Sequence, residues 1–294
     1  MTSDDPLSTV SGVDYEAQYN NSRRVPEVGH IANTWRIRSR GYRSEARAEF
    51  DQPYGPAERT RYDLFLGEDE DEGAATVLYI HGGYWQEGDR KLYSFLAKAL
   101  NASGVNVVIP SYPLAPVVSV LTIVEELRTC LAAVWRRTGV RPIVVGHSAG
   151  GHLTAAMLAT DWSVVGPLPR DLVPAGVAIS GIFDLRPLVT TSINAAVGLD
   201  RDSALAASPY HWLPPPRDRT LIAAVGGDES DEFRRQSREM ADHWLAAGLR
   251  SEYLEVPGAN HFTVIEQLAS PGTALFERVL ELARDSASTA ARGG

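Results

Sequence analysis

Short apolar runs alternate with longer amphipathic segments along most of the chain. The apolar runs are rich in Val, Ile, Leu and Ala, and they lie at 76–80, 105–109, 142–146, 176–180, 220–225 and 252–256. Because most of these runs are apolar at nearly every position, we expect strands that are buried on both faces of a sheet. Between them, apolar residues recur every three or four positions, which predicts helices at 92–103, 117–138, 149–160, 231–247 and 273–285. Strands that alternate with helices predict an α/β fold with a mostly parallel central sheet and helices on both faces.

The two ends of the chain lack this alternation. Residues 14–60 are rich in Arg, Glu and Ala, and we expect helices and an extended lead-in that could form a cap and contribute to the rim of the functional site. The alternating sequence at 61–66 predicts an edge strand. We therefore expect one domain over 14–285, with a disordered N-terminus at 1–13 and a disordered tail at 286–294.

Composition narrows the classes of function. The 294 residues carry a formal net charge of −9, which argues against nucleic acid as a partner. The N-terminus has no basic and apolar leader, and no apolar run reaches the roughly 18 residues of a membrane span, so we expect a cytoplasmic protein without a membrane partner. The single cysteine, Cys130, lies among apolar residues at helical spacing, which favours a buried thiol over a catalytic one.

A G-x-S-x-G motif ends the apolar run at 142–146. It reads GHSAG at 146–150 and leads directly into a predicted helix. A sharp turn between a strand and a helix needs small flanking residues, and it raises the serine hydroxyl above the sheet. The N-terminus of the following helix favours negative charge that develops nearby. The motif in this context predicts Ser148 as a nucleophile.

A second glycine-rich motif, HGGYW at 81–85, comes directly after the first buried run. In lipases and esterases, a loop of this kind supplies backbone N–H groups to an oxyanion hole. Glycines allow such a backbone to approach the substrate closely. We expect the donors to come from Gly82, Gly83 or Tyr84 and from Ala149, the residue after the nucleophile.

The base and the acid should come from two later loops. The chain order in this kind of site is serine, acid, histidine, and of the seven histidines only His261 follows the last predicted strand. The acid should follow the run at 220–225, where Asp228 and Glu229 both fit and their position favours neither strongly. Asp231 and Glu232 are better placed to begin the next helix.

Together these motifs resemble the arylformamidase (kynurenine formamidase) branch of the α/β-hydrolase superfamily, near the hormone-sensitive-lipase-like esterases. The resemblance extends through most of residues 14–282. It rests on HGGYWQ at 81–86, GHSAGGHL at 146–153, SGIFDLRPL at 180–188, ESDEFRRQS at 229–237 and NHF at 260–262. General esterases usually carry HGGG in the first motif, whereas Tyr84 and Trp85 follow the two glycines here, as in the formamidase branch.

The resemblance implies an activity and a set of site residues. Matching the ESDEFRRQS turn to the family puts the acid at Glu229, whereas the general esterase pattern would choose Asp228. The implied substrate is a small molecule with an aromatic leaving group, an aryl formamide such as N-formyl-L-kynurenine. Aromatic residues should then line the leaving-group side, and the candidates are Tyr84, Trp85, Phe183, Trp212 and Phe262. No cofactor and no metal is implied.

Two other functions compete with this interpretation. A broad-specificity carboxylesterase acting on short acyl esters would use the same Ser148, His261 and carboxylate. A catalytically inactive hydrolase fold used for binding would not need these residues, so their joint presence argues against it. The sequence also allows a homodimer.

Overall fold

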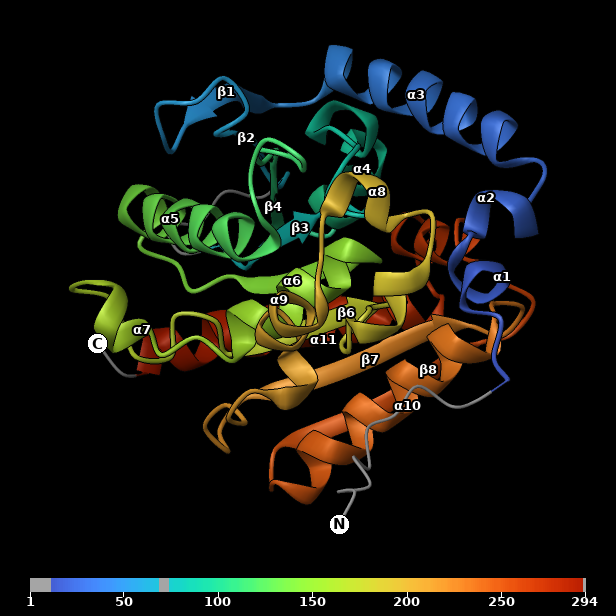
Figure 1. Cartoon of the computed structure of the whole chain (residues 1–294). Coiled ribbons are helices and arrows are strands. Elements are labelled where there is room, and N and C mark those ends of the chain that lie inside the picture. Colours follow the sequence, from blue (N-terminus) through green and yellow to red (C-terminus); the bar gives the residue numbers. More distant parts are fainter. Residues whose placement is uncertain (1–11, 69–73, 293–294) are drawn as a thin grey trace.

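The computed structural model describes residues 12–68 and 74–292, and within them eight strands form one sheet (Figure 1). The strands are β1 Ala48–Pro53, β2 Arg61–Phe65, β3 Thr76–Ile80, β4 Asn106–Pro110, β5 Ile143–His147, β6 Ala175–Ile179, β7 Thr220–Gly226 and β8 Arg250–Val256. Their order across the sheet is β1-β2-β4-β3-β5-β6-β7-β8. β2 runs antiparallel to β1 and β4, whereas the strands from β3 to β8 pair in parallel. The predicted, mostly parallel α/β sheet is confirmed.

Helices cover both faces of this sheet (Figure 1). Side chains of successive strand residues point to opposite faces, so Leu78 of β3 joins one core and Tyr79 joins the other. The first core is covered by α5 (Val120–Thr138), α6 (Ala149–Leu158) and α10 (Asp231–Ala246). The second is covered by α3 (Val28–Glu45), α4 (Ala97–Asn101) and α11 (Ala274–Arg292). Other short helices are α1 Tyr15–Tyr19, α2 Asn21–Arg24, α7 Trp162–Val165, α8 Asn194–Val197 and α9 Arg201–Ala206.

Two elements before β4 differ from the sequence-based expectation. β1 forms the edge of the sheet, so β2, the expected edge strand, lies second; β1 has no fully buried residue and therefore little hydrophobic pattern. In place of one helix at 92–103, two 3₁₀ turns precede α4. There the Ser39 hydroxyl of α3 donates to the carbonyl of Leu92 at 2.7 Å and accepts from the N–H of Phe95 at 3.1 Å. These backbone groups are bonded to a side chain instead of to a regular helix.

The last helix is longer than expected. α11 continues to Arg292, although we expected a helix to 285 and a disordered tail at 286–294. Residues 286–292 contain Ala, Ser, Thr and Arg and no Gly or Pro, so nothing in them stops a helix. The expected disorder at 1–13 falls almost entirely outside the described residues. Within 12–68 and 74–292, no helix combines the length and the apolar character needed to cross a membrane.

Candidate active site

Ser148 occupies a sharp turn between β5 and α6. Its backbone has φ 57° and ψ −118°, which residues with a Cβ rarely adopt. Its N–H donates to the carbonyl of Ile179 at 2.8 Å, which ties the turn to β6. The flanking glycines are required by space: a Cβ on Gly146 would lie 2.1 Å from the oxygen of Gly150, and a Cβ on Gly150 would lie 2.0 Å from that of Ile80. The turn therefore holds Ser148 at the carboxyl edge of the sheet.

The HGGYW loop packs against this turn. A Cβ on Gly82 would lie 3.0 Å from the Cβ of Ser148, so only glycine allows the approach without a shift. The next three residues, Gly83, Tyr84 and Trp85, have φ of 107°, 47° and 59°. Two consecutive non-glycine residues in the left-handed region are strained, and such strain tends to occur at functional sites. The loop thus presents its backbone, rather than side chains, to the serine turn.

His261 and Glu229 form a buried pair. Nδ1 of His261 lies 2.6 Å from Oε2 of Glu229. The other carboxylate oxygen, Oε1, accepts hydrogen bonds from Ser180 Oγ at 2.5 Å and from the N–H of Gly226 at 2.7 Å. A carboxylate in this position keeps the proton on Nδ1 and leaves Nε2 able to accept one. Asp228 is exposed to solvent, so the structure brings Glu229, and not Asp228, to the imidazole.

Two further side chains contact His261. Nε2 of His147 donates to the backbone carbonyl of His261 at 2.7 Å, and the two rings lie 4.7 Å apart. Burial lowers the pKa of His147 well below its usual value, so this ring stays neutral beside His261. The ring of Phe233 also packs against His261, at 4.5 Å. The sequence gives no signal for either role, because both depend on contacts between residues far apart in the chain.

Ser148 and His261 line a cavity of about 330 Å³, which is within the usual size of a ligand site. Its wall is largely apolar and aromatic, and the residues that give it this character include Val28, Trp35, Tyr84, Leu92, Tyr93 and Phe262. Tyr84 and Phe262 belong to the predicted substrate-binding set. The cavity can therefore accept an aromatic group next to the serine.

The other three predicted substrate-binding residues do not line this cavity. Trp85 is fully buried in the core, where its ring meets that of His152 edge-on at 5.0 Å. Phe183 is 1% exposed and packs in the same core. Trp212 packs against that core and donates through Nε1 to the carbonyl of Ala206 at 2.8 Å. The apolar surface of these aromatic rings is used for folding, so the three positions are not part of the cavity wall.

The N-terminal segment forms one wall of the cavity. The lining residues from this segment are Asn21 and Ser22 of α2 and Val28, Gly29, Ala32 and Trp35 of α3. Trp35 is 3% exposed, and its Nε1 donates to Oε1 of Glu266 at 2.9 Å, which ties α3 to the 3₁₀ helix Thr263–Ala269 that follows β8. Figure 1 shows α3, α2 and α1 following one another along one side of the molecule. Residues that come before the main sheet in sequence thus lie beside Ser148.

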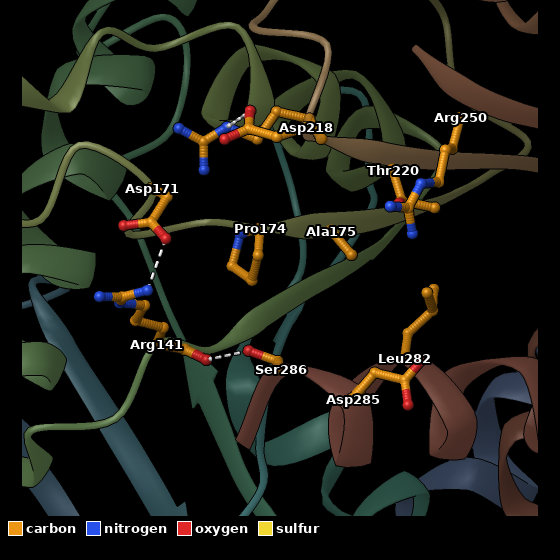
Figure 2. Close-up of a pocket in the computed structure, with 11 residues that line it drawn as sticks. Arg141, Asp171, Pro174, Ala175, Asp218, Thr220, Arg250, Leu282, Asp285 and Ser286 are labelled. Carbon is orange, nitrogen blue, oxygen red and sulfur yellow. Dashed lines mark hydrogen bonds and ion pairs between the residues drawn. The ribbon is translucent and has the colours of Figure 1, made fainter. Parts of the chain in front are cut away.

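A second cavity, of about 300 Å³, lies at the amino ends of the strands, whereas Ser148 lies at their carboxyl ends (Figure 2). Its lining residues include Ala175, Thr220 and Arg250, at the amino ends of β6, β7 and β8. Three arginines and three aspartates line it, and Arg141 pairs with Asp171 at 2.5 Å. Its charges balance, and it lies across the sheet from the serine turn.

Comparison with known proteins identifies the family of the chain. Residues 77–265 match the family model described as the α/β hydrolase fold. The kynurenine formamidase of Danio rerio is 30% identical over 93% of this chain and 97% of its own length. The kynurenine formamidase of Salmo salar is 31% identical over 82% of this chain and 83% of its own length.

The chain belongs to the kynurenine formamidase branch of the α/β-hydrolase family. It is a hydrolase, and the resemblance seen in its motifs is confirmed. A solved structure of a proposed thioesterase from Silicibacter sp. TM1040 is 30% identical, with a TM-score of 0.81 over 91% of this chain and 99% of that one. The carboxylesterase EstE1, cloned from a metagenomic library, shares the fold, at 21% identity and a TM-score of 0.67 over 89% of this chain and 95% of that one.

Proposed function

We propose that this hydrolase cleaves aryl formamides, such as N-formyl-L-kynurenine, into an aromatic amine and formate. The observation that carries the proposal is an arrangement of Ser148, His261 and Glu229 at an aromatic cavity. This arrangement occurs in a chain that is similar to a kynurenine formamidase along nearly its whole length.

Ser148 acts as the nucleophile in the proposed reaction. Its Oγ attacks the formyl carbon while Nε2 of His261 accepts the hydroxyl proton, and Glu229 stabilises the resulting imidazolium. The C–N bond then breaks as His261 gives that proton to the leaving nitrogen, which departs as an aromatic amine. Water, deprotonated by the same imidazole, attacks the formyl ester of Ser148 and releases formate and free enzyme.

Backbone N–H groups of the HGGYW loop and of Ala149 stabilise the oxyanion that forms in both steps. Gly82, Gly83 or Tyr84 supplies the donor from the loop. Ala149 is the first residue of α6, so its N–H has no partner within the helix. Loss of one such donor typically costs about 3–4 kcal/mol of transition-state stabilisation.

The chemistry of the cavity supports an aromatic leaving group. Four of the residues that line it are aromatic, namely Trp35, Tyr84, Tyr93 and Phe262. Ser148 is 2% exposed, so there is little space around its side chain. The acyl part of the substrate is only a formyl group, which needs little space. An arylamine is also a better leaving group than an alkylamine, which lowers the demand on His261 as an acid.

Short acyl esters are the second candidate substrate class. The relative from Silicibacter is described as a proposed thioesterase, and the same nucleophile, base and oxyanion donors would serve an ester or a thioester. The aromatic wall of the cavity favours the formamide, because a short alkyl or thiol leaving group would leave much of that surface without contact.

Product analysis with purified protein tests the proposal. N-formyl-L-kynurenine should yield kynurenine and formate in equal amounts, and Ser148→Ala should reduce the rate to near background. Asp231→Asn is the matched control, because the Asp231 side chain is 89% exposed at the start of α10, and it should keep the wild-type rate. A wild-type protein that hydrolyses p-nitrophenyl acetate but forms no kynurenine would contradict the formamidase proposal and leave the esterase function.

A further inference from the structure

A polar cavity of about 220 Å³ adjoins the aromatic one. Arg24, Glu27 and Asp228 are among the residues that line it. Asn21 and His261 line both cavities, so the two cavities meet at these residues. The polar cavity is therefore adjacent to the cavity that contains Ser148.

Three ionised side chains of the polar cavity are free to contact a ligand. Arg24 ends α2, Glu27 precedes α3, and Asp228 lies in the loop after β7. All three are exposed, and within the part of the chain that the structure describes none of these side chains forms an ion pair or a hydrogen bond. The adjacent Arg23, by contrast, pairs with Glu16 at 3.7 Å. One guanidinium and two carboxylates thus face the same space without partners.

The distribution of charge over the two cavities indicates which ligand they fit together. No lysine or arginine lines the aromatic cavity. Its lining includes one acidic side chain, Glu87. Among the described residues that line either cavity, Arg24 supplies the positive charge, whereas Glu27 and Asp228 add negative charge in the polar cavity. The carboxylate and the ammonium group of one ligand are each stabilised by hydrogen bonds to a side chain of opposite charge. A ligand with an aromatic group at one end and a zwitterion at the other matches this pattern.

We propose that the polar cavity binds the α-amino acid head group of the substrate. Arg24 receives the carboxylate, and Asp228 and Glu27 receive the ammonium group. This assignment rests on the proposed formamidase activity and names the part of the substrate that is recognised. A guanidinium and a carboxylate can form two parallel hydrogen bonds, which gives direction as well as affinity. The site therefore selects aryl formamides that carry an amino acid over those that do not.

An analogue that lacks both head-group charges tests the role of Arg24. The measurement compares kcat/KM for N-formyl-L-kynurenine with that for 2-formamidoacetophenone, which has neither the carboxylate nor the ammonium group. Arg24→Gln should lower the ratio of these two values by about tenfold or more, mainly through KM. Arg24→Lys keeps the charge and should lower this ratio less than Arg24→Gln does. Arg23→Gln is the matched control and should keep the wild-type ratio.

The deamino analogue of N-formyl-L-kynurenine, which keeps the carboxylate, separates the two halves of the head group. Asp228→Asn should raise KM for N-formyl-L-kynurenine several-fold and should have a smaller effect on the deamino analogue. Arg24→Gln should weaken both substrates, because both carry the carboxylate. Equal effects of Asp228→Asn on the two substrates would remove Asp228 from the site.

Failure of the head-group site and failure of the formamidase activity give different results. If both formamides are hydrolysed and Arg24→Gln keeps the wild-type ratio, the head-group site is overturned and the formamidase activity stands. If the wild type hydrolyses neither formamide, L-kynurenine can be tested as a competitive inhibitor of p-nitrophenyl acetate hydrolysis. The proposed site predicts inhibition that Arg24→Gln weakens about tenfold, and equal inhibition of wild type and variant overturns it.

Discussion

The hydroxyl of Tyr84 donates a hydrogen bond to the backbone carbonyl of Tyr19, which lies 65 positions earlier in the chain. Tyr19 is itself fully buried; it donates to Oε2 of Glu232 at 2.9 Å and accepts from Nε2 of Gln236 at 2.5 Å. These contacts connect the HGGYW loop to α1 and, through α1, to α10. Because Tyr84 has a strained positive φ, the contact helps to hold the loop in the conformation that faces Ser148.

Tyr84→Phe removes this hydrogen bond and the one that the hydroxyl accepts from Nδ2 of Asn21 at 3.3 Å, and it keeps the ring in the cavity wall. We expect kcat to fall by about tenfold with a smaller change in KM, because misplaced oxyanion donors weaken transition-state binding more than substrate binding. The matched control is Tyr42→Phe, whose hydroxyl contacts Asn101 on the α4 side of the sheet; it should leave kcat unchanged. An unaltered kcat in Tyr84→Phe would show that the contact with Tyr19 does not position the loop.

Glu229→Gln keeps the shape of the side chain and removes the charge that stabilises the imidazolium of His261. We expect kcat to fall by a factor on the order of 10⁴, as for loss of the acid in other serine hydrolases. Asp228→Asn changes an exposed carboxylate and should lower kcat by less than about tenfold. Steady-state rates with a formamide and with an ester measure both variants. A larger loss in Asp228→Asn than in Glu229→Gln would reverse the assignment of the acid.

Three buried histidines make the stability of the fold depend on pH. Burial lowers the pKa of His81 and His152 from 6.5 to about 4, and that of His147 well below 6.5. Below pH 6.5 the unfolded chain therefore binds more protons than the native protein, and the free energy of unfolding falls as the pH falls. Between pH 7.5 and 5.5 the expected loss is about 1.4 kcal/mol per histidine. Urea unfolding at the two pH values measures it, and equal stability would contradict these native pKa values.

Two N-terminal deletions should differ in effect. Removal of residues 1–13 keeps Asp14, whose side chain caps α1 by accepting from the N–H of Ala17 at 3.0 Å, and should leave kcat/KM within about twofold. Removal of residues 1–40 takes away the wall formed by α2 and α3 and should lower kcat/KM by about 100-fold or more. Trp35→Ala opens the same wall without shortening the chain and should also lower kcat/KM. Unchanged kinetics in the longer deletion would contradict a role of this segment in the site.

The position of Ser148 is predictable from the sequence because the glycines that mark the turn are its near neighbours in the chain. Gly146 and Gly150 are each needed by a close backbone contact, Gly146 with Gly150 and Gly150 with Ile80 of β3, and both belong to the motif itself. The choice between Asp228 and Glu229 is not local. It depends on which of two adjacent side chains points toward a later loop, and position in the sequence does not determine that direction.

The residues of the aromatic wall are likewise not predictable from their positions in the sequence. Trp85 follows Tyr84 directly, yet Tyr84 lines the cavity and Trp85 is buried in the core. Trp35 lines the cavity although it precedes every strand, because α3 packs along the second core near the site. Which ring reaches a cavity is set by packing between distant elements, and an apolar pattern records only that a residue is buried.

The decisive measurement for the formamidase function is kcat/KM for N-formyl-L-kynurenine, measured on one preparation beside p-nitrophenyl acetate and p-nitrophenyl butyrate. We predict a value of about 10⁴ M⁻¹ s⁻¹ or more for the formamide, within the usual range of enzymes, and its loss in Ser148→Ala. A wild-type protein that hydrolysed only the two esters would contradict the formamidase function.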